Sequence, residues 1–457
     1  MSGAPFRRLL VANRGEIAVR VIRACQALGV ETVAAVSEAD RDSLAAHLAT
    51  RAVCIGPAPS RESYLRPETL VAAALGTGCE AVHPGYGFLS ERAAFARMVR
   101  DAKLAFVGPS PEAIEAMGDK ISAVRLATEA GVARVPGTDR IDSPEVARRE
   151  AARIGYPVLL KASAGGGGRG MRVVREEDGI EPAMKAASAE ALAAFGDGTL
   201  YMEKFIERAR HIEIQVIGDR HGNVVHLGER DCSTQRRHQK LIEEAPSPAI
   251  DDAMRAELAD AAVRLAKRVS YEGAGTVEFV YDEDGRRAYF LEMNTRIQVE
   301  HPVTEMVTGR DLVAEQIRVA AGAPLSFAQH EVAMRGHAIE CRINAEDASR
   351  GFAPGPGDIA HWHLPEDEGL RVDTHCFAGY RVPPFYDSLL AKVIAWGPDR
   401  GAALARMATA LEASRIEGVP TTVPFHREVL AHDDFRAARV TTRWVEDSFL
   451  PGAGGAA

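Results

Sequence analysis

Residues 292–302 read Glu-Met-Asn-Thr-Arg-Ile-Gln-Val-Glu-His-Pro. Within nine residues this stretch places two carboxylates, an amide and a guanidinium, which is a dense set of polar side chains for one short segment. The preceding residues, Ala288–Leu291, are apolar and aromatic and predict a buried strand. Asn294 follows Glu292 by two residues, so in a strand the two side chains point to the same face.

A second predicted strand, Thr276–Val280, precedes the first one, and the turn residues Asp282–Gly285 lie between them. This pattern predicts a β-hairpin. If the hairpin is centred on the last of the turn residues, Glu278 lies directly opposite Glu292. Like charges that face each other across strands are unfavourable by about 0.2–1 kcal/mol, so we expect a cation between them. Two carboxylates and the Asn294 amide are hard oxygen ligands, which suit Mg²⁺ and not zinc. The alternative is a pair of solvated glutamates on an edge hairpin.

Composition excludes several classes of protein. A chain of 457 residues with 46% hydrophobic and 26% charged residues is expected to form more than one globular domain. The net charge of −9 argues against a general nucleic-acid binder. The six cysteines form no CxxC motif, which predicts neither a zinc site nor a disulfide framework and fits a reducing cytoplasm. Residues 1–5 lack an apolar signal core and no run has the length of a membrane span, so we expect a cytoplasmic protein.

The N-terminal region predicts an α/β fold. Arg8–Ala12 is a predicted strand, Glu16–Leu28 a helix that ends at Gly29, and Glu31–Val36 the next strand. Because the GxGxxG motif is absent, a dinucleotide site is not expected. The segment His83–Ser90 follows a short apolar run and predicts a loop at a strand end, where the ligand sites of α/β proteins gather. A tight structural turn is the alternative.

Residues 165–170 contain five glycines, which is incompatible with the interior of a helix or strand. An apolar strand that ends at Lys161 precedes them and Met171–Val174 follows, so the stretch predicts a flexible hairpin loop whose amides can approach phosphates. It is not a P-loop, because GxxxxGK[ST] is missing. A plain linker is the alternative, and the position of Lys161 at the foot of the loop favours a phosphate lid.

The central and C-terminal segments predict further strands. His211–Ile217 alternates polar and apolar residues and predicts a half-buried strand, whose polar face is more often solvated. Glu229–Lys240 is dense in hydrogen-bond donors and would ordinarily be an exposed basic loop. Because the chain is acidic, a local donor patch near the paired glutamates favours an anionic ligand. Thr304–Ala321 predicts one amphipathic helix. From about Glu331 we expect a mostly antiparallel domain with a helix at Arg400–Leu411.

Together these motifs resemble biotin carboxylase, a member of the ATP-grasp superfamily. The motifs that carry the resemblance are residues 12–18, 83–91, 117–120, 161–171, 229–246, 292–305 and 337–346. The implied fold is α/β, a three-domain ATP-grasp fold. It comprises an N-terminal Rossmann-like (pre-ATP-grasp) domain at 1–117 and an ATP-grasp domain at 118–330 with a mobile lid at about 136–205. A C-terminal α+β biotin carboxylase domain at 331–450 and a disordered tail at 451–457 complete it.

The resemblance also implies a role for each site residue. Those that would contact the ATP phosphates are Lys120, Lys161 and the lid amides of Gly167 and Gly168. Those around the adenine would be Glu203, Lys204 and Ile206. Those on the ribose and phosphate side would be His211, Gln235 and His238. Mg²⁺ or Mn²⁺ would be held by Glu278, Glu292 and Asn294. Bicarbonate would be bound by Lys240, Arg296, Gln298 and the backbone of Val299. Glu300 would be the general base, and biotin would lie against Arg342 with Tyr86 at its border.

The implied reaction is an ATP-dependent carbon–nitrogen ligation. Arg296 can hold planar bicarbonate with two parallel hydrogen bonds, and Glu300 would remove its proton, a step that typically contributes about 10²–10⁴-fold. The dianion would attack the γ-phosphate of ATP and form carboxyphosphate, which breaks down to CO₂ and phosphate. That phosphate would deprotonate biotin, and Arg342 would stabilise the biotin enolate that attacks CO₂.

The same resemblance implies the partners. Because the chain contains no Ala-Met-Lys-Met motif and no carboxyltransferase region, we expect a separate biotin carboxyl carrier protein and a carboxyltransferase subunit. We expect a homodimer, and no nucleic-acid or membrane partner. The final acceptor would be an acyl-CoA such as acetyl-CoA or propionyl-CoA, with pyruvate as the alternative. Two other functions stay open: a carbamoyl-phosphate type of ATP-grasp ligase, and a regulatory nucleotide-binding subunit with a dead site. The donors in Arg236–Lys240 and Arg296–Glu300 favour biotin carboxylation.

Overall fold

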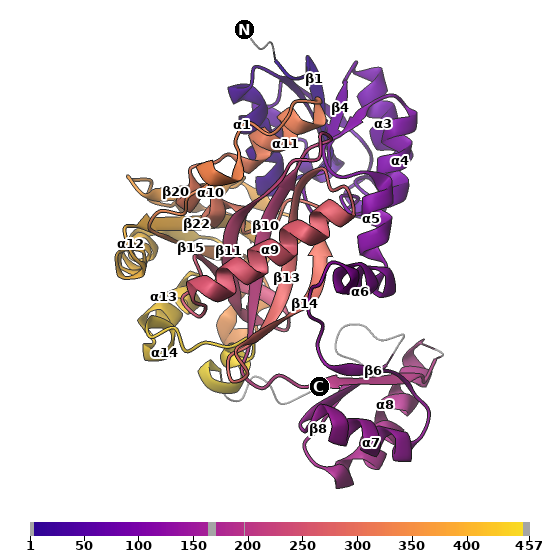
Figure 1. Ribbon diagram of the computed structural model, residues 1–457. Coiled ribbons are helices and arrows are strands. Elements are labelled where there is room, and N and C mark those ends of the chain that lie inside the picture. Colours follow the sequence, from indigo (N-terminus) through magenta and orange to yellow (C-terminus); the bar gives the residue numbers. More distant parts are fainter. Residues whose placement is uncertain (1–3, 163–170, 196, 451–457) are drawn as a thin grey trace. The chain divides into compact units, whose positions relative to one another are not determined.

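The computed structural model describes residues 4–162, 171–195 and 197–450. Two expectations therefore lie outside the described residues: the phosphate-binding amides of Gly167 and Gly168, and the disordered tail at 451–457. The chain forms two compact units. The core unit comprises Met1–Val132, Arg210–Val280 and Leu291–Ala457, and the lid unit comprises Ala133–Ala209 and Tyr281–Phe290. Figure 1 colours both along the sequence.

A parallel five-stranded sheet forms the N-terminal part of the core unit, in the order β3-β2-β1-β4-β5. Its strands are β1 (Arg8–Val11), β2 (Glu31–Val36), β3 (Arg51–Cys54), β4 (Ala81–His83) and β5 (Ala105–Phe106). The helices of this part are α1 (Gly15–Ala27), α2 (Leu44–Leu48), α3 (Pro67–Gly76), α4 (Ala93–Asp101), α5 (Pro111–Gly118) and α6 (Lys120–Glu129). Because the strand order reverses between β1 and β4, the loops after these two strands border a crevice of the kind in which α/β proteins bind ligands.

An eight-stranded sheet is the main sheet of the central and C-terminal segments, in the order β14-β13-β10-β11-β12-β15-β22-β20. Its strands are β10 (Ala209–Gly218), β11 (Val224–Arg236), β12 (Gln239–Ala245), β13 (Gly273–Asp282), β14 (Arg287–Asn294), β15 (His337–Asn344), β20 (Leu370–Thr374) and β22 (Leu389–Gly397). The antiparallel pair of β12 and β15 joins strands from the two sides of residue 330. The central and C-terminal segments therefore share one sheet.

Helices cover this sheet. The helix α9 (Asp252–Arg268) packs on β11, and α12 (Arg400–Ala413) packs on β22 (Figure 1). The α12 side chains of Met407 and Leu411 share a buried cluster with Ile343 and Val393 of the sheet. The C-terminal segment also contains α13 (Val423–Ala431), α14 (Asp433–Arg436) and a five-residue π-helix at Val445–Phe449, which the sequence did not predict. Its short strands are β16 (Glu346–Asp347), β17 (Ala353–Pro354), β18 (Gly357–Asp358), β19 (His361–His363), β21 (Arg381–Val382) and β23 (Arg415–Glu417).

The single helix predicted at Thr304–Ala321 is wrong. The structure has two helices there, α10 (His301–Thr308) and α11 (Leu312–Ala320). Gly309 ends α10 in the left-handed conformation with φ +67°. Asp311 then caps α11, since its side chain accepts a hydrogen bond from the Ala314 N–H. Both signals are local, but the amphipathic pattern continues through the break and conceals it.

The lid unit contains a four-stranded sheet in the order β6-β9-β7-β8. Its elements are β6 (Gly137–Ile141), α7 (Pro144–Ile154), β7 (Val158–Ala162), β8 (Met171–Val174), α8 (Ile180–Phe195) and β9 (Leu200–Lys204). The antiparallel register of β7 and β8 confirms that the glycine stretch joins two paired strands. The strand β6 has the sequence Gly-Thr-Asp-Arg-Ile, which has little apolar character. None of the helices in the described ranges is both long enough and apolar enough to cross a bilayer.

Candidate active site

The ammonium of Lys240 lies at the centre of a buried cluster of carboxylates in the core unit. Its Nζ lies 2.6 Å from Glu213 Oε2, 2.5 Å from Glu300 Oε1 and 3.1 Å from Glu278 Oε1. Burial alone would lower the pKa of Lys240, but these carboxylates outweigh it and raise the pKa well above its usual value. The sequence predicted Lys240, Glu278 and Glu300 as site residues, and the structure brings them together.

Glu278 accepts hydrogen bonds from Asn294 Nδ2 at 2.9 Å and from Gln298 Nε2 at 3.0 Å. His211 Nε2 lies 3.2 Å from the other carboxylate oxygen of Glu278, Oε2. Burial raises the pKa of Glu278, but Lys240 and His211 reverse that effect and hold it below its usual range. Burial would lower the pKa of His211, whereas Glu278 raises it to about 9. Glu278 is therefore ionised, and a protonated His211 faces it.

Arg296 lies in the loop between β14 and α10 and donates to three other side chains. Its Nη2 donates to Asn294 Oδ1 at 3.0 Å, its Nη1 to Gln298 Oε1 at 2.9 Å, and its Nε to Glu91 Oε2 at 2.9 Å. The sequence did not single out Glu91 as a site residue. The only signal was its place at the end of the motif at 83–91, because no local pattern shows that this carboxylate will contact an arginine about two hundred residues later.

Glu300 has no exposed surface and is held by two cations. Lys240 donates to one carboxylate oxygen, and Arg342 Nη2 donates to the other at 3.0 Å. Burial raises the pKa of Glu300, but Lys240 and Arg342 outweigh that effect and hold it below its usual value. The carboxylate is therefore ionised and able to accept a proton.

Arg342 also donates from Nε to Glu243 Oε1 at 2.6 Å. Glu243 lies opposite Glu340 in the register of β12 and β15, and neither side chain has any exposed surface. Burial raises the pKa of Glu243 to about 7 and that of Glu340 well above its usual value. The sequence missed these two carboxylates, since no local pattern shows that the strands β12 and β15 are covered on both faces.

A small pocket of about 120 Å³ lies at the reversal point of the N-terminal sheet. Its lining residues are Asn13, Arg14, Gly15, Glu16, Tyr86, Gly87, Phe88, His375, Asp387 and Leu389. Asn13 Nδ2 donates at 2.7 Å to the carbonyl oxygens of Pro84 and Tyr86, and the Tyr86 hydroxyl donates to Glu16. A side chain at Gly85 would lie 2.9 Å from Asn13 Nδ2. The loop at 83–90 is thus both a tight structural turn and one wall of a pocket.

For the central strands, two of the alternative interpretations are wrong. The polar face of β10 is not solvated, because Glu213 and Gln215 have no exposed surface and bond to the fully buried Arg230 at 2.6 and 2.7 Å. The segment at 229–240 is not an exposed loop. It forms the hairpin of β11 and β12, with only the turn at Arg237 and His238 in the left-handed region. Neighbouring strands supply counter-ions to these charges, which a local pattern cannot reveal.

The remaining expected residues are more dispersed. Gln235 is buried on β11, His238 is exposed in the turn after it, and Glu292 is exposed on β14. In the lid unit, Lys161 forms an ion pair with Glu203 across β7 and β9. Also in that unit, Lys204 Nζ donates to the carbonyl oxygens of residues 155 and 156, and the half-buried Ile206 follows β9. Lys120 begins α6.

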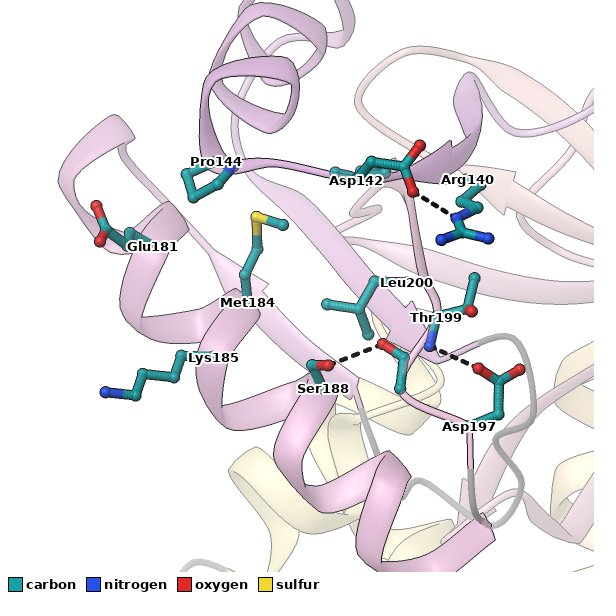
Figure 2. Close-up of a pocket in the computed structure, with 12 residues that line it drawn as sticks. Arg140, Asp142, Pro144, Glu181, Met184, Lys185, Ser188, Asp197, Thr199 and Leu200 are labelled. Atoms are coloured by element: carbon teal, nitrogen blue, oxygen red, sulfur yellow. Dashed lines mark hydrogen bonds and ion pairs between the residues drawn. The ribbon is translucent and has the colours of Figure 1, made fainter.

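A larger pocket, of about 540 Å³, lies within the lid unit. Figure 2 shows that its wall is mixed in charge. Arg140 forms an ion pair with Asp142, Ser188 Oγ donates to the Gly198 carbonyl oxygen at 2.9 Å, and the Thr199 N–H donates to Asp197. None of the site residues expected from the sequence lines this pocket. Because several of its polar groups bond to one another, we assign it no function.

A site of this kind, on a fold with a parallel N-terminal sheet and a separate lid sheet, defines an ATP-grasp carbon–nitrogen ligase. Three family models match the chain in succession: the N-terminal domain of biotin carboxylase at residues 5–114, the ATP-binding domain of the carbamoyl-phosphate synthase L chain at 119–328, and the C-terminal domain of biotin carboxylase at 340–447. The chain belongs to the biotin carboxylase family. The predicted family, fold class and enzyme class are confirmed.

Relatives with different names match over nearly the whole chain. The biotin carboxylase of Nostoc sp. is 53% identical over 97% of this chain and 99% of its own length. A pyruvate carboxylase subunit from Methanothermobacter thermautotrophicus is 52% identical over 97% of this chain and 90% of its own. The biotin carboxylase domain dimer of the Hydrogenobacter thermophilus 2-oxoglutarate carboxylase, solved with MgADP, ADP and bicarbonate, has a TM-score of 0.88 and 49% identity, covering 99% of each chain. Overall similarity therefore does not select one carboxyl acceptor.

Proposed function

We propose that this chain carboxylates biotin on a separate carrier protein, with ATP and bicarbonate as co-substrates and carboxyphosphate as the intermediate. The observation that carries the proposal is the fully buried, ionised Glu300 held between Lys240 and Arg342. A carboxylate and a bound anion repel each other, so Glu300 can take a proton from the anion only if cations offset this repulsion. Lys240 and Arg342 are such cations, and both lie within hydrogen-bond distance of Glu300.

The bicarbonate site would be formed by Arg296, Lys240, Gln298 and the backbone of Val299. Arg296 already contacts the two amides on either side of it, Asn294 and Gln298, so its guanidinium plane is oriented before any ligand binds. Glu300 would remove the bicarbonate proton, and the cations would stabilise the charge as the dianion attacks the γ-phosphate.

The residues present fit a magnesium or manganese ion. Glu278 is ionised and accepts a hydrogen bond from Asn294 Nδ2, so two of the three residues expected to supply oxygen ligands lie side by side. Glu292 would complete the set from the same strand as Asn294. A bound divalent ion would neutralise phosphate charge. The protein side chains would position the ion and keep it next to the anion site.

We propose that the nucleotide is bound by the residues that the family resemblance implies. In the core unit these would be Lys120, His211, Gln235 and His238. In the lid unit these would be Lys161, Glu203, Lys204, Ile206 and the amides of Gly167 and Gly168. Lys161 is paired with Glu203 within the lid unit, and a phosphate could replace this carboxylate as its counter-ion.

Biotin would enter the pocket at Tyr86, where Arg342 would stabilise the enolate. We propose that the partners are the biotin carboxyl carrier protein and a carboxyltransferase subunit, that the chain forms a homodimer, and that it acts in the cytoplasm. The three-domain division at residues 117 and 330 is part of the same proposal, and the ranges of the matching family models support it. The final acceptor is an acyl-CoA or pyruvate.

The direct test is bicarbonate-dependent ATP hydrolysis with and without free biotin, together with transfer of label from bicarbonate to biotin. We expect biotin to increase ADP release and to become labelled. If biotin adds nothing to ADP release, the carbamoyl-phosphate type of ligase gains support. If ATP binds but neither hydrolysis nor labelling occurs, the chain is a nucleotide-binding regulatory subunit.

A further inference from the structure

Lys392 is a fully buried cation next to the site and has no role in the chemistry described above. In the register of the eight-stranded sheet it lies directly opposite Arg342 on one side and Asp373 on the other. Two cations that face each other across neighbouring strands repel, so each needs its own counter-ions. Arg342 is paired with Glu243 and Glu300, and Lys392 is paired with Asp373 at 3.7 Å and with Glu16 at 3.1 Å.

The two cations hold two consecutive residues of the same loop. Lys392 Nζ donates to the carbonyl oxygen of Val299 at 2.9 Å, and Arg342 Nη2 donates to the carboxylate of Glu300 at 3.0 Å. The peptide group that joins Val299 to Glu300 is therefore held at its carbonyl by Lys392, while the side chain that follows is held by Arg342. A buried charge-assisted hydrogen bond to a carbonyl oxygen restricts the orientation of that peptide plane.

Lys392 also reaches the wall of the small pocket. Its partner Glu16 accepts the hydrogen bond from the Tyr86 hydroxyl, and both residues line the pocket. One ammonium thus contacts the pocket wall, through Glu16, and the loop that carries the proposed base, through Val299. These contacts join α1 of the N-terminal sheet to β22 and to the loop before α10.

We infer that Lys392 is a positioning residue, which sets the Val299–Glu300 peptide relative to the pocket at Tyr86 and thereby places the proposed bicarbonate site against the proposed biotin site. The inference rests on the proposed function, because Lys392 itself touches neither substrate. Misplacement of a reacting group by about 1 Å can cost roughly 100-fold in rate. A side chain that holds the loop from outside the site can therefore control turnover.

The first test is the variant Lys392→Met, which keeps most of the side-chain length and removes the ammonium. We expect kcat/KM for bicarbonate to fall by roughly 10- to 100-fold, while the affinity for ADP, measured by calorimetry, stays within about twofold of wild type. We also expect faster hydrogen exchange at the amides of Glu300 and His301. This second readout depends on the loop and not on catalysis.

Removal of Lys392 leaves Glu16 buried without its cation, so the single variant could fold poorly. The double variant Lys392→Met with Glu16→Gln removes that charge as well. We expect it to recover stability but not the kinetic parameters or the amide protection. Glu16→Gln alone introduces a side-chain amide that can still bond to Lys392. This variant therefore isolates the effect of the Glu16 charge on KM for biotin.

The matched control is Arg400→Met, since Arg400 on α12 also forms a buried ion pair, with Glu244 of β12 at 2.6 Å, but contacts no residue of the site. It should lower the melting temperature and leave KM for bicarbonate unchanged. If Lys392→Met keeps wild-type kcat/KM for bicarbonate and wild-type amide exchange, its role is purely structural and the inference is wrong. If wild type shows no biotin-dependent turnover, the proposed function fails, while the exchange measurement still decides whether Lys392 holds the loop.

Discussion

Glu300 shows how much of this site depends on single residues. It has no exposed surface and lies between Lys240 and Arg342, so its charge is stabilised before any substrate binds. The sequence predicted its role through resemblance alone, because a glutamate that follows a valine carries no local sign of burial. Its neighbours Glu243 and Glu340 show the opposite case, since no pattern singled them out and yet both lie beside the same arginine.

We predict that Glu300→Gln lowers kcat for biotin-dependent ATP hydrolysis by about 10²–10⁴-fold, because only the proton acceptor is lost. Nucleotide affinity, measured by calorimetry, should be unchanged. The control is Glu315→Gln, since Glu315 is a buried glutamate on α11 that bonds to Ser326 away from the site. That variant should keep wild-type turnover. Weakened ADP binding in Glu300→Gln would contradict its assignment as the base.

We predict that Glu292→Gln raises the Mg²⁺ concentration needed for half-maximal activity by roughly tenfold or more, because a ligand charge is removed. The measurement is a titration of ATP hydrolysis with Mg²⁺ at saturating bicarbonate. Glu283→Gln, at the other end of the same hairpin, serves as the control and should titrate as wild type does. An unchanged titration for Glu292→Gln would remove this residue from the metal site.

At the scale of elements, local rules predicted a helix boundary correctly where periodicity and stop signals agreed. They failed where the amphipathic periodicity continued through a helix stop signal. Glu16–Leu28 was predicted as a helix and forms α1 almost residue for residue, since periodicity and the glycine stop agree. Thr304–Ala321 was predicted as one helix, but the left-handed Gly309 and the capping Asp311 divide it. This break matters for the site, because α10 starts directly after Glu300 and its length sets where the chain turns away.

We predict that Gly309→Ala destabilises the protein by about 1–2 kcal/mol, because alanine is disfavoured at φ +67° although no atom lies near enough to clash with its Cβ. The control is Gly76→Ala. Gly76 is the last residue of α3, also has open space around it, and does not have a positive φ. That change should be neutral or slightly stabilising. The midpoint of urea unfolding measures both, and equal shifts would contradict the backbone argument.

At the scale of the whole molecule, buried ion pairs connect segments that lie far apart in the sequence. Glu305 on α10 accepts hydrogen bonds from Arg20 of α1 at 2.9 Å and from Arg371 of β20 at 2.7 Å. These three residues come from the three expected domains, and all lie in the core unit. The compactness of that unit therefore rests partly on charges that are covered by protein.

We predict that Glu305→Gln lowers stability at pH 7 by about 1.5–3 kcal/mol, because it weakens charged hydrogen bonds to Arg20 and Arg371, which keep only Asp311 and Asp373 as carboxylate partners. Burial would raise the pKa of Glu305, but Arg20 and Arg371 lower it to about 2. Its contribution is therefore complete above pH 4.5 and is lost as the pH falls from 4.5 towards 2. The difference between variant and wild type in urea unfolding should shrink across that range. Glu112→Gln, which breaks an exposed pair with Arg100, should show no measurable difference.

By itself the sequence determined most of the longer strands and helices, the hairpin that carries Glu278 and Glu292, and the motifs that identify the family. These depend on side-chain periodicity and turn residues, which act over a few neighbours. Only the tertiary structure decided that Lys240 faces Glu278 and Glu300, that Lys392 lies opposite Arg342, and that the polar face of β10 is buried. A charge is tolerated in the interior only where a partner meets it in space, and such partners are dozens to hundreds of residues away along the chain.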